Sequence, residues 1–273
     1  MCNSNGAGHG HSHTHSHANG NGHGHGHGQG EDGRREEEEG KAVARIKIEK
    51  DVLGKNNSLA DYNRGWLAGR GVLALNLVSS PGAGKTTLLE RTVRDLAGAV
   101  AVSVIEGDQE TDFDAQRIRA AGCRAVQLNT GVGCHLDATM VARGLAELEP
   151  PVGSVVFIEN VGNLVCPALF DLGERAKVVV CSVTEGDDKP LKYPHMFRAG
   201  GVVLLNKIDL LPYVPFDTER FLDGVRQLNP AVRVIPVSAL RGEGLAEWYG
   251  WVREQLADPT PPPRGEGLKT RLS

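Results

Sequence analysis

The segment 79–87 has the residue types and the spacing of a loop that binds phosphate groups. It reads Ser-Ser-Pro-Gly-Ala-Gly-Lys-Thr-Thr and follows the apolar run 72–78, so a strand, a glycine-rich turn and a helix start are expected in that order. In such a loop, backbone N–H groups hold the phosphates, Lys85 reaches the β- and γ-phosphate oxygens, and the Thr86 hydroxyl can bind Mg²⁺. The residues expected to contact the phosphates are Pro81, Gly82, Ala83, Gly84, Lys85, Thr86 and Thr87.

One position departs from the usual pattern of this loop. Ser79 stands where the pattern has its first glycine, whereas Gly82 and Gly84, which let the backbone approach a phosphate, are both present. A chance glycine-rich turn before a capped helix is the alternative interpretation. The preceding strand and the Lys-Thr-Thr sequence favour the phosphate loop.

A second motif, Asn-Lys-x-Asp at 206–209, indicates which base the nucleotide carries. It follows the apolar strand candidate 201–205. Guanine presents N1–H and N2–H₂ donors side by side, and the Asp209 carboxylate can accept from both, while the Lys207 stem lies along the base. The remaining contacts are expected from Asn206, Ser238 and Ala239, with a backbone N–H at 238–239 meeting the guanine O6. Each piece alone is a weak signal, but their order after a phosphate loop predicts GTP.

Phosphoryl transfer requires positioning and charge neutralisation more than covalent chemistry. Lys85 and the loop amides are expected to offset the developing charge, and Thr86 to bind Mg²⁺. Asp108, at the end of the second strand candidate, is the acidic residue best placed to reach Mg²⁺, directly or through water. Glu159 occupies the place of a Walker-B acid, and Gly162 can donate its N–H to the γ-phosphate. No residue stands out as activating water, so slow GTP hydrolysis to GDP is expected.

Three residues have side chains that suit a soft metal ion. Cys134 and His135 follow a turn and precede a helix candidate, and Cys166 follows the segment 157–162, which occupies the place of the loop that senses the γ-phosphate in GTPases. Two thiolates and an imidazole fit Zn²⁺ or Ni²⁺. On spacing alone a structural role for these residues is the commoner explanation.

The first 40 residues contain a second group of possible metal ligands. Eight histidines alternate mostly with Gly, Ser or Thr, and a flexible chain can place several imidazoles on one ion. An expression tag is the alternative, but the alternation and the acidic run that follows favour native metal binding. The candidate ligands are Cys2, His9, His11, His13, His15, His17, His23, His25 and His27.

The elements that must position these residues alternate regularly after residue 72. Because strands alternate with helices, we expect an α/β fold, a mostly parallel sheet with helices on both faces, as in P-loop GTPases. Strands are expected at 72–78, 99–105, 124–128, 153–158, 177–183, 201–205 and 232–237. Helices are expected at 85–97, 112–121, 136–148, 217–228 and 244–257, with a helical lead-in at 42–53 and 58–69. The predicted domains are a disordered tail 1–40, the lead-in 41–71, a G domain 72–257 and a flexible tail 258–273.

The composition limits which partners the protein can bind and in which cell compartment it is expected. The tail 1–40 holds two arginines and six acidic residues, so it carries the whole net charge of −4. The rest of the chain is therefore neutral. We therefore expect no nucleic-acid partner and, without an apolar run of membrane-spanning length, no membrane partner. The five cysteines are odd in number and scattered, which argues against a disulfide framework and for a cytoplasmic protein.

Taken together, these motifs resemble the hydrogenase nickel-incorporation GTPase family, the accessory proteins of [NiFe]-hydrogenase maturation. The resemblance covers about 42–256, and its further segments are 106–112, 133–137, 159–164 and 183–190. It implies a GTP-hydrolysing metallochaperone that delivers nickel to the hydrogenase large subunit together with a second maturation protein. It also implies that Cys134, His135 and Cys166 form a metal site near the interface of a GTP-dependent homodimer.

One difference qualifies this resemblance, and two alternatives, a urease-accessory GTPase and a nickel-storage protein, stay open. Many members begin with a Cys-x-x-Cys-Gly-Cys nickel motif, of which this chain keeps only Cys2. The related urease accessory GTPase carries Cys-Pro-His, whereas Ala168 follows Cys166-Pro167 here. A nickel-storage protein with vestigial GTP binding is the alternative of another class, and the intact motifs at 85–86 and 206–209 argue against it.

Overall fold

The computed structural model describes residues 51–108, 113–131 and 133–258. The predicted tail 1–40, with Cys2 and the eight N-terminal histidines, lies outside the described residues, as does the predicted tail 258–273 apart from Asp258.

In the described part of the chain, the strands form a parallel sheet of seven in the order β3-β2-β4-β1-β5-β6-β7. The predicted parallel α/β fold is confirmed, and each strand overlaps its predicted range. The strands are β1 (Leu73–Ser79), β2 (Val102–Asp108), β3 (Arg124–Asn129), β4 (Val155–Glu159), β5 (Ala176–Ser182), β6 (Gly200–Asn206) and β7 (Arg233–Pro236).

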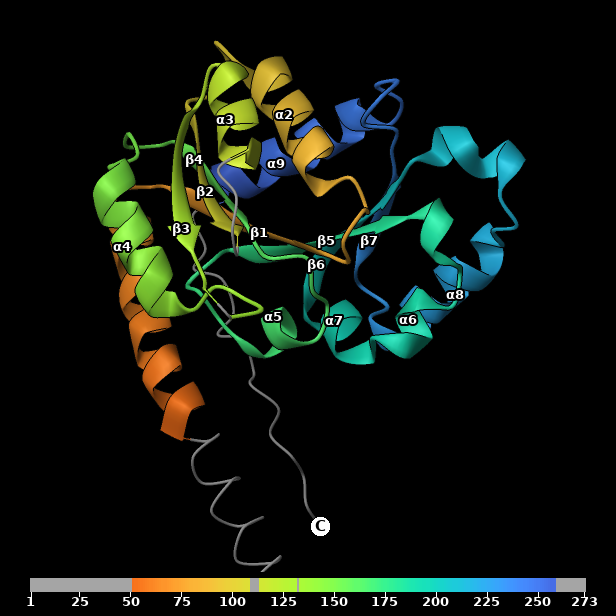
Figure 1. The fold of residues 1–273 in the computed structure, drawn as a ribbon, viewed down its shortest axis with the longest axis horizontal. Helices are drawn as coiled ribbons and strands as arrows, with labels where there is room; N and C mark the ends of the chain where they lie inside the picture. Colours follow the sequence, from red (N-terminus) through yellow and green to blue (C-terminus); the bar gives the residue numbers. More distant parts are fainter. Residues whose placement is uncertain (1–50, 109–112, 132, 259–273) are drawn as a thin grey trace, which may run out of the picture. The chain divides into compact units, whose positions relative to one another are not determined.

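Helices cover both faces of this sheet (Figure 1). One face carries α2 (Lys85–Leu96), α3 (Phe113–Ala120) and α9 (Leu245–Ala257), and the apolar cluster beneath them includes Leu88, Phe157 and Trp248. The other face carries α4 (Ala138–Leu148), α5 (Cys166–Leu169), α6 (Lys189–Lys192), α7 (Pro194–Ala199) and α8 (Thr218–Leu228). The central strand β1 serves both layers because alternate side chains point to opposite faces, with Leu75 and Leu77 in one cluster and Ala74 in another.

The helical lead-in differs from its prediction. The expected stretches 42–53 and 58–69 correspond, in the described residues, to one helix over 51–69 that continues through the gap between them. The short helices α5 to α7 and the two 3-10 turns, Val183–Glu185 and Ile208–Tyr213, were not predicted. Each is one or two turns long, which is too short for a helical period to show in the sequence. None of the described helices is long and apolar enough to span a membrane.

A buried chain of polar side chains passes through Asn76, the middle residue of β1. Asn160 donates to Asn76 Oδ1 at 3.2 Å, and Asn76 donates to Glu174 Oε1 at 3.1 Å. Glu174 pairs with Lys177, whose ammonium also donates to the Phe170 carbonyl at 2.9 Å. Burial alone would raise the pKa of Glu174, but Lys177, Asn76 and a backbone N–H outweigh burial and hold that pKa well below its usual range. This chain therefore ties the segment after β4 to the segment before β5.

We predict that Glu174→Gln destabilises the fold at neutral pH by about 3–5 kcal/mol, because it leaves the Lys177 ammonium buried without its partner. An acid with a lowered folded-state pKa stabilises the fold above its ordinary pKa and loses that contribution as the pH falls. The difference in unfolding free energy between parent and variant should thus be full at pH 7 and shrink below about pH 4.3. Urea unfolding at several pH values measures it, with the exposed Glu147→Gln as control. A pH-independent difference would contradict the assignment.

Candidate functional site

The phosphate loop connects β1 to α2 with two glycines in left-handed backbone conformations. Gly82 has φ 78° and Gly84 has φ 90°, and a Cβ at Gly84 would lie 2.6 Å from Asn206 Nδ2. Only glycine adopts such a conformation in so close a contact without strain. Ser79, by contrast, is the last residue of β1 and adopts strand conformation, so the missing first glycine causes no strain there.

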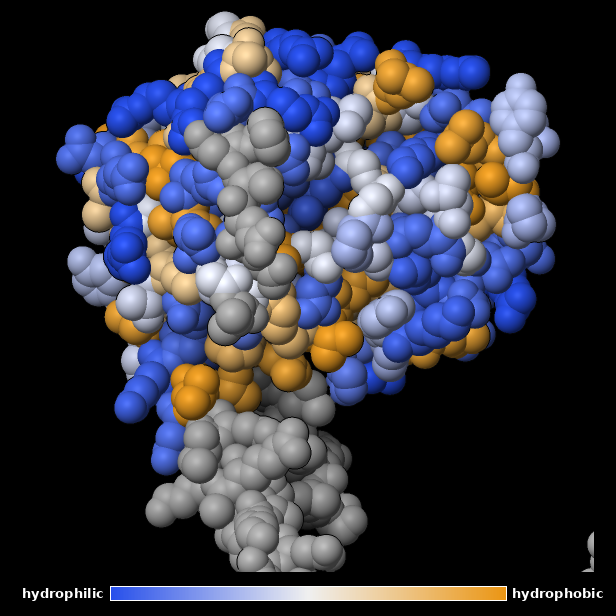
Figure 2. All heavy atoms as spheres, viewed as in Figure 1, coloured by the Kyte–Doolittle hydropathy of each residue, from blue (hydrophilic) through white to orange (hydrophobic). Residues whose placement is uncertain are grey.

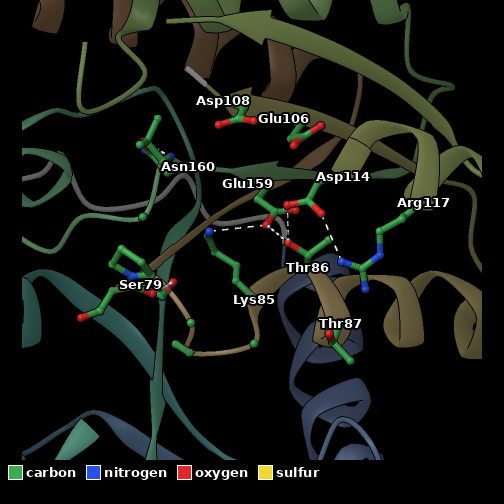
Figure 3. Close-up of a pocket in the computed structure, with 18 of the residues that line it drawn as sticks. Ser79, Lys85, Thr86, Thr87, Glu106, Asp108, Asp114, Arg117, Glu159 and Asn160 are labelled. Atoms are coloured by element: carbon green, nitrogen blue, oxygen red, sulfur yellow. Dashed lines mark hydrogen bonds and ion pairs between the residues drawn. The ribbon is translucent and has the colours of Figure 1, made fainter. Parts of the chain in front are cut away.

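The loop forms one wall of an open pocket of about 570 Å³ at the carboxyl ends of β1, β2 and β4 (Figure 3). Figure 2 shows this side of the molecule, on which hydrophilic residues predominate and apolar ones are scattered among them. This is the edge at which a parallel sheet with helices on both faces binds its ligands. Of the sequence-predicted residues, the pocket brings together Pro81, Gly82, Ala83, Gly84, Lys85, Thr86, Thr87, Asp108, Glu159, Gly162 and Lys207.

Thr86 lies between two carboxylates in this pocket. Its Oγ1 is 2.8 Å from Glu159 Oε1 and 3.0 Å from Asp114 Oδ2, and Lys85 Nζ lies 3.4 Å from the same Glu159 oxygen (Figure 3). A hydroxyl has one hydrogen, so Thr86 can donate to only one of the two carboxylates at a time. The arrangement therefore favours a cation next to these oxygens.

Glu159 has the electrostatic properties expected of a residue that binds such a cation. Its side chain is 4 % exposed, and burial raises its pKa, although Lys85 opposes the rise. Its Oε2 atom is buried without a hydrogen-bond partner. An unpartnered buried carboxylate oxygen is costly unless a ligand completes it. The donor set of Thr86, Glu159 and Asp114 consists of hard oxygens, which suits Mg²⁺.

Asp114 is the pocket residue that sequence reasoning missed. It lies in the first turn of α3 and its carboxylate contacts Thr86, whereas Asp108, the residue predicted to reach Mg²⁺ directly or through water, lines the same pocket near Glu106 (Figure 3). Arg117 orients Asp114 with a hydrogen bond of 3.1 Å and also pairs with Glu90. An aspartate in a first helical turn usually stabilises the helix dipole, so its type and place gave no separate signal.

The residues expected to recognise the base meet behind the phosphate loop. Asn206, at the end of β6, donates to the Ala83 carbonyl at 2.9 Å, and Lys207 donates to the Gly82 carbonyl at 2.6 Å. Lys207 has φ 62°, an uncommon conformation for a residue other than glycine. These two hydrogen bonds tie the base-recognition motif to the phosphate loop.

The loop after β7 holds Asp209 in place. Ser238 Oγ donates to Asp209 Oδ1 at 2.6 Å, and the Ala239 N–H donates to Asn206 Oδ1 at 3.1 Å. The Ser238 N–H donates to the Glu243 carbonyl at 2.9 Å. Both amides proposed to meet a guanine O6 thus have protein partners here.

The three predicted metal ligands come together from two separate segments. Cys134 Sγ lies 2.9 Å from Cys166 Sγ and 3.6 Å from His135 Nδ1, and the three ligand atoms lie within 4.8 Å of one another. The His135 ring packs on Phe170 with centroids 4.0 Å apart. Burial lowers the pKa of His135, against the effect of Asp137, so the ring is kept neutral and able to bind a metal. Burial and the Cys134 thiol raise the pKa of Cys166, so metal binding must displace a proton.

The phosphate pocket and the sulfur cluster share the segment that follows β4. Asn160 lines the pocket, and its Oδ1 accepts from the Leu136 N–H, next to His135, at 3.0 Å. Asn163 donates to the Cys134 carbonyl at 3.4 Å. A ligand that moves the segment after β4 therefore also moves Cys166, which lies in it, and the hydrogen bonds to the backbone at Cys134 and Leu136.

We predict that Asp114→Asn raises the Mg²⁺ concentration needed for half-maximal GTP hydrolysis roughly 10–100-fold, the usual effect of losing a supporting carboxylate. The measurement is a Mg²⁺ titration of steady-state turnover at saturating GTP. Glu90→Gln is the control, since it also releases Arg117 but does not contact Thr86. Equal Mg²⁺ dependence in parent and Asp114→Asn would rule out this role.

Comparison with known proteins agrees with this geometry. The family model described as CobW/HypB/UreG, nucleotide-binding domain, matches residues 73–236. Hydrogenase maturation factor HypB of Escherichia coli K12 is 57 % identical over 210 residues, which cover 77 % of this chain and 72 % of the relative.

Two solved structures share the fold. The crystal structure of HypB from Archaeoglobus fulgidus has a TM-score of 0.70 and 37 % identity, covering 74 % of this chain and 99 % of that one. HypB from Helicobacter pylori, in complex with nickel, has a TM-score of 0.70 and 36 % identity, covering 74 % and 95 %. On these similarities, the chain belongs to the HypB family of hydrogenase maturation factors.

Proposed function

We propose that this chain is a GTP-hydrolysing metallochaperone that binds nickel and takes part in its insertion into the [NiFe]-hydrogenase large subunit. The observation that carries the proposal is the shared segment 159–166, which has a phosphate-pocket carboxylate at one end and a metal-ligating thiol at the other. The nickel-bound relative from H. pylori supports nickel as the cargo of the Cys134–His135–Cys166 cluster. Zn²⁺ is a second ion that the same donor set would accept.

The residues of the pocket have different roles in GTP hydrolysis. Bound Mg²⁺ would supply charge neutralisation at the phosphate oxygens. Thr86, Glu159 and Asp114 hold that ion, and Lys85 and the loop amides offset charge that develops on the transferring phosphoryl group. A Cβ at Gly162 would lie 3.1 Å from Pro81 Cγ, so any larger residue there would crowd the phosphate loop. In this proposal the Gly162 N–H donates to the γ-phosphate.

The remaining parts of the proposal concern assembly and storage. The chain acts in the cytoplasm as a homodimer in its GTP state and works with a second nickel-maturation protein. The eight histidines of the N-terminal tail bind several nickel ions as a store. Deleting residues 1–30 would lower nickel stoichiometry and leave GTP turnover unchanged.

We predict that Asp209→Asn weakens GTP binding roughly 10–100-fold, because the charged acceptor for two guanine donors is lost. The Asn side chain has an NH₂ donor that matches the C2 carbonyl of xanthine, so the variant should accept xanthosine triphosphate. Competition binding with GTP, ATP and xanthosine triphosphate measures the change. The control is Asp223→Asn on the exposed side of α8. Equal competition by ATP and GTP in the parent would refute guanine selection.

We predict that metal affinity at the sulfur cluster differs between the GDP and GTP-analogue states by about 5–150-fold, the range of typical coupling energies. The reason is that Cys166 belongs to the segment that must respond to the γ-phosphate, whereas Cys134 and His135 do not. Coupling is reciprocal, so bound metal shifts nucleotide affinity by the same factor.

The measurement is a Ni²⁺ titration of the protein lacking residues 1–30, in both nucleotide states. Cys134→Ala and Cys166→Ala should abolish the coupling while GTP binding stays nearly intact. Cys123→Ala is the control, since this thiol is buried in the core away from the cluster. Equal metal affinity in the two nucleotide states would disprove the coupling.

A further inference from the structure

The helix over 51–69 contacts both segments that supply the metal ligands. It lies beside α4 in Figure 1, drawn in orange. Its inner face carries two asparagines, Asn56 and Asn63, which are 6 % and 1 % exposed. Apolar residues usually occupy such positions, because burying an amide is costly unless it is hydrogen-bonded.

Asn56 bridges the two ligand segments directly. Its Oδ1 accepts from the Ala138 N–H at 2.9 Å, and its Nδ2 donates to the Asp171 carbonyl at 2.8 Å. Ala138 lies three residues after His135, at the start of α4. Asp171 follows Phe170, the residue whose ring packs on His135, in the segment that begins at Cys166.

Asn63 also bonds to Ala138, and on the other segment it bonds to the residue after Asp171. Its Nδ2 donates to the Ala138 carbonyl at 2.9 Å and to the Leu172 carbonyl at 3.0 Å. Arg64 adds an ion pair of 2.5 Å to Asp171 Oδ2. Gly173, with φ 89°, lies so close to the helix that a Cβ there would be 2.6 Å from the Ala60 carbonyl. The helix therefore fixes the main chain at 138 relative to the main chain at 171–172.

We propose that Asn56 and Asn63 are positioning residues for the Cys134–His135–Cys166 metal site, an inference that rests on the proposed function of that site. Neither asparagine is among its ligands. They act by holding the two ligand segments in register, so that the thiols and the imidazole are pre-arranged before an ion binds. Groups that orient metal ligands commonly change metal affinity 10–100-fold when removed.

A purely structural role is the competing explanation, since Asn56 also satisfies one of the free N–H groups at the start of α4. That role predicts a general loss of stability, with equal consequences for metal and nucleotide binding. The positioning role predicts weaker metal binding with an unchanged KM for GTP, where KM is measured without nickel so that the coupling of the two sites does not contribute.

The test uses the full chain carrying Cys2→Ser and Ni²⁺ as the probe. Sulfur-to-nickel charge-transfer absorbance then reports the cluster alone, because imidazoles give no such band and the other thiols, Cys123 and Cys181, are buried. The Ni²⁺ concentration at half-saturation of this band, set by a competing chelator, is compared between Asn56→Ala and Asn57→Ala. Asn57 is the matched control, since it is adjacent, identical in type and exposed.

We expect half-saturation of Asn56→Ala to require roughly 10–100-fold more Ni²⁺ than the parent, with unchanged KM for GTP, and Asn57→Ala to match the parent. Asn56→Ser keeps one short hydroxyl, which cannot bridge both Ala138 and Asp171 but places no charge in this buried position, so we expect an intermediate value. If Asn56→Ala does not fold, this second variant replaces it in the comparison with Asn57→Ala.

Two results would overturn the proposal while leaving the metal site intact. One is equal half-saturation in the Asn56 and Asn57 variants. The other is a rise in KM for GTP that parallels the loss of nickel binding. If the parent shows no band that Cys166→Ala removes, the metal site itself is wrong and the positioning role is refuted with it.

Discussion

The arrangement of both sites depends on two adjacent residues at the end of β4. The Glu159 side chain contacts Lys85 and Thr86 in the phosphate pocket. The Asn160 side chain bonds instead to the backbone beside His135 and to Asn76 in the sheet. Successive side chains along an extended backbone point to opposite sides. The Glu159 side chain therefore faces the nucleotide pocket, and the side chain of the next residue, Asn160, bonds to the segment that carries His135.

This constraint is transmitted through Asn160, whose side-chain amide has hydrogen-bond partners on both its oxygen and its nitrogen. The Asn160 amide uses its oxygen for two backbone N–H groups, those of Leu136 and Val161, and its nitrogen for Asn76. Asn76 passes the connection to Glu174, which pairs with Lys177. A buried polar group with all its partners adds specificity to a core, whereas one that loses a partner is costly. The contact network thus favours one arrangement of the segment after β4 over intermediate ones.

The sequence predicted what depends on local pattern. Strands and long helices follow from apolar periodicity, and the phosphate loop and the Asn206–Asp209 motif follow from fixed spacing. The two thiols and the imidazole were predicted to meet partly from a resemblance, because Cys134 and Cys166 lie 32 positions apart. Asn56 could not be found in this way, since its partners lie 82 and 115 positions away. Long-range hydrogen bonds of this kind leave no periodic signal in the chain.

The same reasoning explains why Asp114 was missed and Asp108 was chosen. Asp108 is the last residue of β2 and Asp114 lies in the next helix, α3. The sequence favoured Asp108, because the carboxyl ends of the strands lie at the ligand edge of the sheet. In the structure Thr86 contacts Asp114, the second residue of α3, and Arg117 fixes the orientation of that carboxylate. A carboxylate on a helix start can be moved with that helix, whereas one inside a parallel strand cannot. Placing one acidic group on β4 and the other on α3 therefore makes the cation site depend on the position of α3, in the way that the metal cluster depends on the position of the segment after β4.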